Sequence, residues 1–406
     1  MQAETLRLVG ADQQVPLVTG ETTRYVNLDY AASAPALVAV AEAVEALGDW
    51  YSSVHRGAGF KSRIATAAYE GAREAVRSFL GARSDDAVIF TRNTTDSINL
   101  LAAALPDDVA VIGFAGEHHA NLLPWQRRGF TCLPVPASPA DLLERLEATL
   151  RAGSGPRLVA ITGASNVTGE LVPLDPVAEL AHRHNARLLV DAAQLAPHRP
   201  IDMAATGIDF LAMSGHKLYA PYGAGVLVGA PDWLRGGPFL RGGGAVRLVT
   251  VDDVVWAELP DRQEAGSPNV LGAVALGAAC STLSAYRMSR VAAHEEALTA
   301  FARSRFGRVP GFEHYTLWGS DAPRVGLFTF NLDGYMHDQL AAILSAEYGI
   351  GVRHGCFCAH PLMIELLHIE RAESDRLMSA TRRGEHPRLP GAARISFGLG
   401  STEADV

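Results

Sequence analysis

The sequence predicts an α/β fold built on a mostly parallel sheet whose two faces are covered by helices. Short apolar runs, typical of buried strands, alternate with helix-forming segments through about residue 230. Leu188–Val190 ends in the acidic Asp191, and the mostly apolar run Ile208–Met213 leads to Ser214 and Lys217. Open α/β sheets bind ligands at the carboxyl ends of their strands, so this pattern predicts a small-molecule site there.

The segments before residue 188 follow the same plan. The expected strands are Tyr25–Asp29, Ala87–Phe90, Val109–Ile112 and Leu158–Ile161. The expected helices between them are Val38–Leu47, Ser62–Leu80, Ile98–Leu105 and Asp175–His184. Thr91–Asp96 joins a strand to a helix start, where hydroxyls and free backbone N–H groups suit either a bound phosphate or simple helix capping.

Beyond residue 230 the chain predicts a long loop and then a smaller α+β unit. Residues 235–267 are rich in glycine and irregular, which is typical of functional or interface loops. The elements expected after this loop are one long helix over Ala273–Ser304, a strand near Gly326–Asn331, a helix near His337–Tyr348 and a strand at Arg394–Phe397.

The length of 406 residues allows two domains. We expect an N-terminal arm over residues 1–25 that packs with the small domain, a large domain over residues 26–285 and a small C-terminal domain over residues 286–406. Ser401–Val406 ends the chain without a closing helix, as expected if the sequence is cut short.

Composition narrows the class of protein. The formal net charge of −9 argues against nucleic acid or an anionic membrane as the main partner. No apolar run approaches the roughly 20 residues that span a bilayer, and the N-terminus lacks a secretory signal pattern. The four cysteines are too few for a disulfide framework, so we expect a cytoplasmic protein with catalytic or inert thiols.

An aspartate and a lysine at one sheet edge suit pyridoxal phosphate (PLP) chemistry. Lys217 would form the Schiff base, and Asp191 would keep the pyridine nitrogen protonated so that the ring accepts electrons. An isolated Asp–Lys pair is more often a surface salt bridge, so the surrounding motifs decide between the two interpretations.

Six short motifs occur in an order that resembles a known enzyme family. They are Val54-His-Arg-Gly57, Glu117-His-His-Ala-Asn121, Ser165-Asn-Val-Thr-Gly169, Asp191-Ala-Ala-Gln194, Ser214-Gly-His-Lys217 and Glu264-Ala-Gly-Ser-Pro268. The sequence resembles the class V aminotransferase superfamily of fold-type I PLP enzymes over nearly its whole length. Within it, the likeness is to the second group of cysteine desulfurases and selenocysteine lyases. The resemblance implies the fold type I architecture of PLP-dependent transferases, PLP as cofactor and a homodimer.

The resemblance also implies roles for individual residues. Lys217 would carry the cofactor and move the Cα proton, while Asp191 would pair with the pyridine nitrogen. Gln194 would hydrogen-bond the ring hydroxyl, and His118 would stack on the ring and assist proton transfer. The implied phosphate ligands are Thr94, Thr95, Ser214, His216 and, from the other subunit of the dimer, Ser267.

Four residues are implied at the substrate. Asn166 and Arg394 would hold it, Arg394 through the substrate carboxylate, which a guanidinium binds with two parallel hydrogen bonds. Arg353 and His55 are further candidates for the substrate pocket.

The segment Arg353–Pro361 resembles the Arg-x-Gly-x-x-Cys-Ala segment of the second desulfurase group, which implies that Cys358 is the nucleophile. Its thiolate would attack the Sγ of substrate cysteine and leave a protein persulfide and alanine. Nearby cationic or potentially cationic side chains, Arg353, His354 and His360, favour a thiolate. The alternative is a buried, inert cysteine.

Cys356 departs from the pattern of the second group. A Gly-Cys-Phe-Cys segment also resembles the desulfurase domain of molybdenum-cofactor sulfurases, so Cys356 is either a resolving thiol or a spectator. With His354, Cys358 and His360 it forms an H-x-C-x-C-x-H string that suggests zinc. A single strand cannot easily wrap four ligands around a tetrahedral ion, and no CxxC pair supports the site, so we expect no metal.

Together these observations predict a PLP-dependent cysteine desulfurase that converts L-cysteine to L-alanine. A sulfur-acceptor protein is a further predicted partner. One alternative keeps PLP but changes the chemistry, as in a selenocysteine lyase, an epimerase or an aminotransferase acting on another amino acid. The other alternative is a non-enzymatic scaffold of the same fold that binds a sulfur-acceptor partner.

Overall fold

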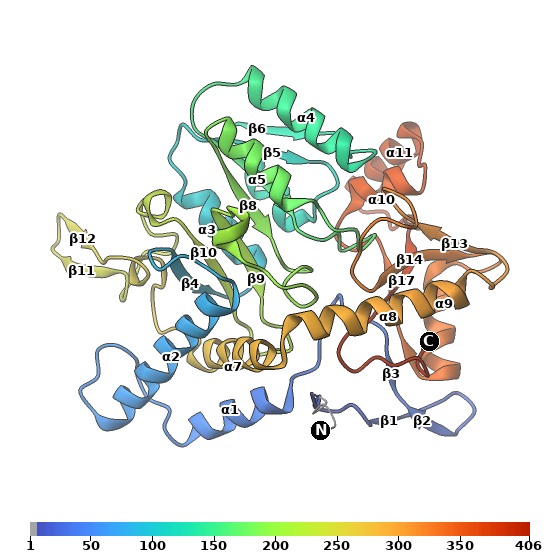
Figure 1. Ribbon diagram of the computed structural model, residues 1–406, viewed down its shortest axis with the longest axis horizontal. Coiled ribbons are helices and arrows are strands. Elements are labelled where there is room, and N and C mark those ends of the chain that lie inside the picture. The colour runs from blue at the N-terminus through green and yellow to red at the C-terminus, as the bar shows by residue number, and fades with distance from the viewer. Residues whose placement is uncertain (1–5) are drawn as a thin grey trace.

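A seven-stranded sheet forms the centre of the protein, and the computed structural model describes residues 6–406 (Figure 1). Residues 1–5 of the expected N-terminal arm lie outside the described residues. The strands are β4 (Ala87–Thr91), β5 (Ala110–Phe114), β6 (Phe130–Leu133), β7 (Arg157–Thr162), β8 (Ala186–Asp191), β9 (Phe210–Ser214) and β10 (Gly225–Gly229). Their order is β4-β10-β9-β8-β7-β5-β6, and every strand except β10 runs in one direction. This confirms the predicted mostly parallel sheet.

Helices cover both faces of this sheet, and alternate strand residues supply the two cores. Leu188 and Val190 pack into the core beneath one set of helices, whereas Leu189 between them faces the other set. The helices that contribute to the first core include α2 (Phe60–Phe79), α4 (Pro139–Ala152), α5 (Leu174–Arg183) and α7 (Val270–Tyr286). The second core is covered by α3 (Thr94–Ala104). Burial on both faces explains why the strands read as continuous apolar runs.

The expectation of one long helix over Ala273–Ser304 is wrong. The segment forms α7 and α8 (Met288–Phe306), which meet at an angle of 77° at Arg287. Arg287 has a φ of 75°, in the left-handed region, which ends the hydrogen-bond ladder of α7. Within residues 6–406 no single helix is long and apolar enough to cross a membrane, and these two pass that test only as a bent pair.

A four-stranded antiparallel sheet follows α8. Its order is β13 (Phe312–Tyr315), β14 (Leu327–Leu332), β17 (Ala392–Ser396) and β16 (Arg353–Gly355). The helices beside it are α9 (His337–Tyr348), α10 (His360–Leu366) and α11 (Arg371–Arg382). The N-terminal strands are β1 (Gln14–Pro16), β2 (Thr22–Arg24) and β3 (Val26–Asn27), and β3 pairs with β15 (Ile350–Gly351) after α9. The domain boundaries at residues 25 and 285 stay a prediction.

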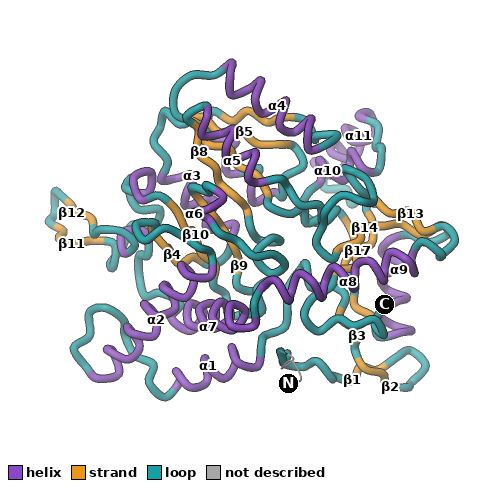
Figure 2. The backbone as a smooth tube through the Cα atoms, in the orientation of Figure 1, coloured by secondary structure: helices purple, strands orange, loops and turns teal. Residues whose placement is uncertain are grey.

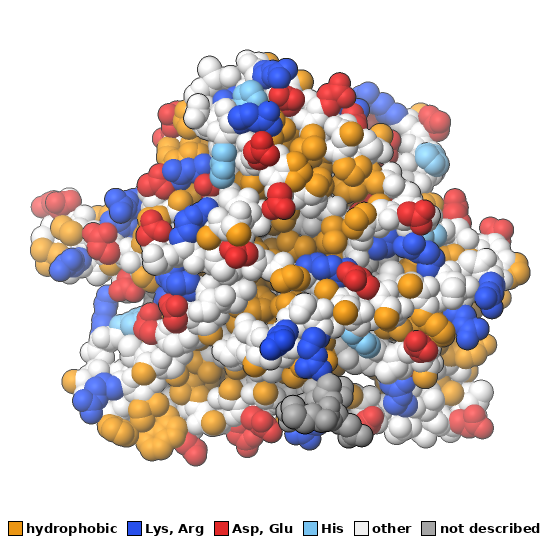
Figure 3. Space-filling view, viewed as in Figure 1, with side chains coloured by type: hydrophobic (Ala, Val, Ile, Leu, Met, Phe, Trp, Pro, Cys, Tyr) orange, Lys and Arg blue, Asp and Glu red, His pale blue; other side chains and the backbone are white. Residues whose placement is uncertain are grey.

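The glycine-rich segment 235–267 is less irregular than its sequence suggests, because it contains the hairpin β11 (Val246–Val249) and β12 (Val254–Trp256). The hairpin projects from the body of the protein (Figure 2). Its exposed apolar side chains include Leu248, Val249 and Val251. Figure 3 shows further hydrophobic surface at the end of the molecule that carries α1 (Val38–Gly48) and α2. Apolar side chains in these positions suit an interface.

Candidate active site

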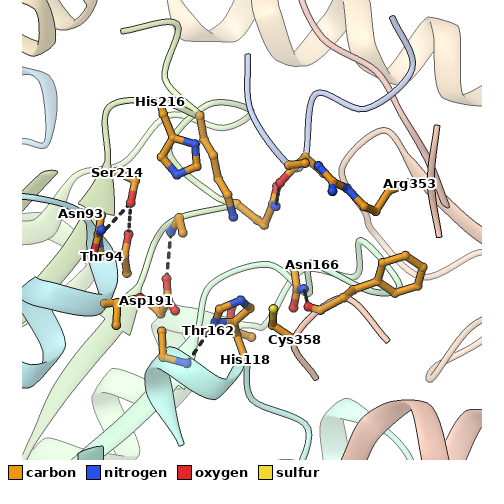
Figure 4. Close-up of a pocket in the computed structure, with 18 of the residues that line it drawn as sticks. Asn93, Thr94, His118, Thr162, Asn166, Asp191, Ser214, His216, Arg353 and Cys358 are labelled. Carbon is orange, nitrogen blue, oxygen red and sulfur yellow. Dashed lines mark hydrogen bonds between the residues drawn. The ribbon is translucent and has the colours of Figure 1, made fainter. Parts of the chain in front are cut away.

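The carboxyl ends of β5, β7, β8 and β9 meet the N-terminus of α3 around a cavity of about 330 Å³ (Figure 4). Parallel strands deliver their last residues to the same edge, so residues far apart in sequence converge there. The predicted site residues that line this cavity are Thr94, Thr95, His118, Asn166, Asp191, Gln194, Ser214, His216, Lys217, Arg353, Cys358 and Arg394.

Asp191 and Lys217 lie on the same cavity wall with opposite pKa shifts. Asp191 ends β8 and is buried, and burial raises the pKa of its carboxyl, although the Ala193 N–H (3.0 Å) and Lys217 favour the ionised form. Burial lowers the pKa of the Lys217 amine to about 8, although the charge of Asp191 acts to raise it. A lysine with this pKa is partly neutral near pH 7, as a nucleophilic amine requires.

The N-terminus of α3 forms an anion-binding corner. Asn93 caps the helix by accepting from the Asp96 N–H (3.0 Å), and the Ser214 Oγ accepts from the Thr94 N–H (2.8 Å) and meets the Thr94 hydroxyl at 2.7 Å. Burial, followed by the charge of Lys217, lowers the pKa of His216 to about 4, so its ring is neutral. Hydroxyls, a neutral imidazole and a helix N-terminus suit a phosphate.

His118 presents a neutral ring to the cavity. It follows β5, and its Nδ1 accepts from the Ala120 N–H at 3.0 Å, which leaves Nε2 to carry the proton. Burial is the main cause that lowers the pKa of His118 to about 4, and Lys217 adds to it. A flat, uncharged ring in this position suits stacking on an aromatic ligand.

Glu117 precedes His118 and supports the site without lining the cavity, although no role was predicted for it from the sequence. It is 2% exposed, and its Oε1 accepts from the Thr162 N–H (3.1 Å) while Oε2 accepts from the Asn121 amide (2.7 Å). Burial raises the pKa of its carboxyl to about 8. The carboxyl thus ties the end of β7 to the turn that holds His118. Its place in the Glu117–Asn121 motif was the only available signal.

Two arginines that line the cavity share one aspartate as a partner. Arg394 is buried, donates to the Asn166 carbonyl (2.8 Å) and contacts Asp29 at 3.4 Å. Arg353 reaches the same carboxylate at 2.9 Å, although it is half-exposed. Burial lowers the pKa of Arg394 to about 10, against the charge of Asp29. No role was predicted for Asp29, which is the last residue of the expected strand Tyr25–Asp29.

Cys358 lies on an ordered loop that opens to the cavity. Phe357 and Cys358 both have left-handed φ angles (52° and 55°), and the side chain of Cys358 is exposed. The Asn166 amide donates to the Phe357 carbonyl (2.7 Å), and the His119 N–H donates to that of Cys358 (2.8 Å). The loop therefore depends on partners from the large sheet.

Cys356 points away from this cavity. Its Sγ donates to the Pro390 carbonyl at 3.1 Å, and burial raises the pKa of the thiol, which disfavours the thiolate. Strand β16 ends at Gly355, so the two cysteines do not lie on the single strand from which zinc was argued against.

Two predicted residues lie outside the Lys217 cavity. His55 and Ser267 line a separate hollow of about 430 Å³, where the His55 ring meets the Glu70 carboxylate at 2.8 Å. Within one chain, neither residue reaches the cavity that contains Lys217. The expectation that Ser267 acts on the site of another subunit stays a prediction.

The sequence that forms this fold and cavity matches a known protein family. The model for the class-V aminotransferases (Aminotransferase class-V) matches residues 26–406. The chain belongs to the class-V aminotransferase family. The family resemblance inferred from the motifs is therefore confirmed.

Similar members of the class-V aminotransferase family are cysteine desulfurases. A cysteine desulfurase of Dickeya dadantii is 38% identical over 362 residues, covering 85% of either chain. The crystal structure of an Escherichia coli cysteine desulfurase in its S-sulfonic acid form has a TM-score of 0.77, with 34% identity and coverage of 94% of this chain and 92% of that chain. A Thermococcus onnurineus cysteine desulfurase, an apo structure, has a TM-score of 0.80 at 28% identity, with the same coverage.

Proposed function

We propose that this protein is a PLP-dependent cysteine desulfurase that converts L-cysteine to L-alanine. The single observation that carries the proposal is that an exposed cysteine, Cys358, shares one cavity with Lys217 and Asp191. The related cysteine desulfurases support the same assignment. A PLP enzyme of another activity would not need a thiol at this place.

The cavity fits PLP. The Gln194 Oε1 is buried without a hydrogen-bond partner, while its amide donates to the Ala31 carbonyl at 2.6 Å. An orphaned buried acceptor facing a cavity calls for a ligand donor, and the ring hydroxyl of PLP would supply one. Asp191 would pair with the pyridine nitrogen, His118 would stack on the ring, and Thr94, Ser214 and His216 would hold the phosphate.

When bound, PLP accepts the electron pair released at the substrate Cα. Lys217, with its lowered pKa, removes the Cα proton and returns it to the product. Arg394 orients the substrate through its carboxylate, and Asn166 holds both Arg394 and the Phe357 carbonyl.

Cys358 performs the sulfur step. Its thiolate attacks the Sγ of the substrate; a new S–S bond forms and the Cβ–Sγ bond breaks. The electron pair of the broken bond stays with the three-carbon product, which takes up protons and leaves as alanine. The transferred sulfur remains on Cys358 as a persulfide, so the step needs no external oxidant.

The test is a single turnover of the holoenzyme with L-cysteine and no added thiol. We expect one equivalent of alanine per active site and a mass increase of one sulfur on Cys358. Cys358→Ser is expected to abolish both, whereas Cys356→Ser, the matched control, retains them. Normal alanine production by Cys358→Ser with L-cysteine would refute the proposal. Thiol-independent turnover of L-selenocysteine alone would instead indicate a selenocysteine lyase.

We further propose a homodimer in which Ser267 of each subunit completes the phosphate site of the other. Its separation from Lys217 within one chain supports this arrangement. Lys217→Ala and Ser267→Ala subunits should both be impaired as pure proteins. A mixed dimer of the two contains one site with both residues intact, so mixing should restore activity. No restoration in a verified mixed dimer would contradict the shared site.

A further inference from the structure

A second cavity lies on the outer side of Cys358. It has a volume of about 430 Å³, beside the inner cavity that contains Lys217. Its lining residues are Thr95, Asn99, His118, His119, Ala120, Leu123, Pro124, Arg127 and Cys358. We call it the outer chamber. Cys358 and His118 line both cavities, so the thiol lies at the boundary between them.

The Cys358 thiol can be reached from the inner cavity and from the outer chamber. A sulfur delivered to Cys358 from the inner cavity must leave again before a second turnover. The inner cavity is occupied by cofactor and product at that moment, according to the proposed function on which this inference rests. The outer chamber offers a route to the same sulfur that does not cross the inner cavity.

The chamber has the chemistry of a site for a small anion with an apolar stem. Arg127 supplies the positive charge of the chamber. Its side chain is exposed and makes no ion pair or side-chain hydrogen bond with any of residues 6–406. None of the lining residues is acidic. Leu123, 52% exposed, and Pro124 provide an apolar wall beside it. A cavity of this size holds a small molecule.

The floor of the chamber is braced. The rings of His119 and His360 stack at 5.0 Å with an interplanar angle of 3°, and the His119 Nε2 accepts from the His360 N–H at 3.2 Å. The His119 N–H holds the Cys358 carbonyl. These contacts hold the backbone of Cys358 in place between the two cavities. A ligand in the outer chamber therefore meets a sulfur atom whose position is constrained.

We propose that the outer chamber binds a small carboxylate-bearing thiol, which receives the sulfur from Cys358. Arg127 pairs with the carboxylate, and the thiolate of the acceptor attacks the outer sulfur of the Cys358 persulfide. A new S–S bond forms on the acceptor, the S–S bond to Cys358 breaks, and the electron pair leaves on the Cys358 Sγ as a thiolate. The acceptor departs as a persulfide, and no other oxidant or reductant is consumed.

The test compares two acceptor thiols in steady-state alanine production by the holoenzyme at saturating L-cysteine. 3-Mercaptopropionate carries a carboxylate and no amino group, so it cannot act as the amino acid substrate; 2-mercaptoethanol is neutral. We expect saturation with 3-mercaptopropionate at a concentration roughly three- to tenfold below that for 2-mercaptoethanol. Arg127→Ala should bring this ratio toward one, and Arg127→Lys should restore part of it.

Arg371→Ala is the matched control, because Arg371 lies on α11 with 95% of its side chain exposed and lines neither cavity. It should leave the ratio unchanged. Three outcomes overturn the inference: rates linear in both thiols, a ratio insensitive to Arg127→Ala, or turnover only with a protein acceptor. The single turnover without added thiol separates the two proposals, because it tests alanine formation before any acceptor is needed.

Discussion

The buried carboxyl of Glu117 should make the stability of the protein depend on pH in a way that one substitution removes. Its pKa is about 8 in the folded protein, where burial raises it, against an ordinary value of 4.5. The unfolded chain therefore ionises Glu117 at a pH where the folded chain keeps it protonated. The resulting contribution to stability is present below the unfolded pKa and is lost as pH rises through the folded one.

The magnitude follows from the two pKa values. Each pH unit in which only the unfolded chain is ionised at Glu117 lowers the unfolding free energy by about 1.4 kcal/mol. Ionisation is partial near pH 5 and near pH 8, so the total loss between these two values is roughly 3 to 4 kcal/mol. Glu117→Gln cannot ionise, so its unfolding free energy should lack this loss. The NH₂ group of the glutamine must face either the Asn121 NH₂ or the Thr162 N–H, which are both donors, and this costs about 1 to 3 kcal/mol at every pH.

Urea denaturation of the cofactor-free protein at several pH values, followed by far-UV circular dichroism, measures the effect. Other groups also titrate in this range, including Lys217 with a pKa of about 8, so the difference between wild type and Glu117→Gln is the informative quantity. We expect the variant to be the less stable protein at pH 5 and to overtake the wild type by pH 8. Parallel curves across this range would refute the reasoning.

Three further predictions concern packing and the cysteine loop. Gly277→Ala should lose about 1 to 3 kcal/mol of unfolding free energy by denaturant titration, because the new Cβ would lie 2.6 Å from an α-carbon of α2, outweighing the better helix propensity of alanine. Asn166→Asp sets a carboxylate against the Phe357 carbonyl, so it should loosen the loop and speed alkylation of Cys358 by iodoacetamide; an unchanged rate would contradict this. Cys356→Ser should leave the L-cysteine KM within about twofold of wild type, since its thiol faces away from the cavity; a larger change would assign it a role.

The sequence predicted the parts of the site that depend on strand ends. Asp191 and Ser214 follow directly from apolar strands, and parallel strands bring such residues to one edge regardless of detail. No role was predicted for Glu117, because its role depends on a hydrogen bond from the backbone N–H of Thr162. This tertiary contact has no sequence pattern in either segment. The break at Arg287 was also missed, since neither glycine nor proline marks the bend.

Two arginines that line the Lys217 cavity lie opposite each other on neighbouring strands. Arg353 and Arg394 are register partners on β16 and β17, and like charges in such positions repel. Both form ion pairs with the single carboxylate of Asp29, so two cations share one negative charge. An anionic ligand beside the two guanidinium groups would supply a second negative charge and reduce this repulsion, so its binding should stabilise the pairing of β16 with β17.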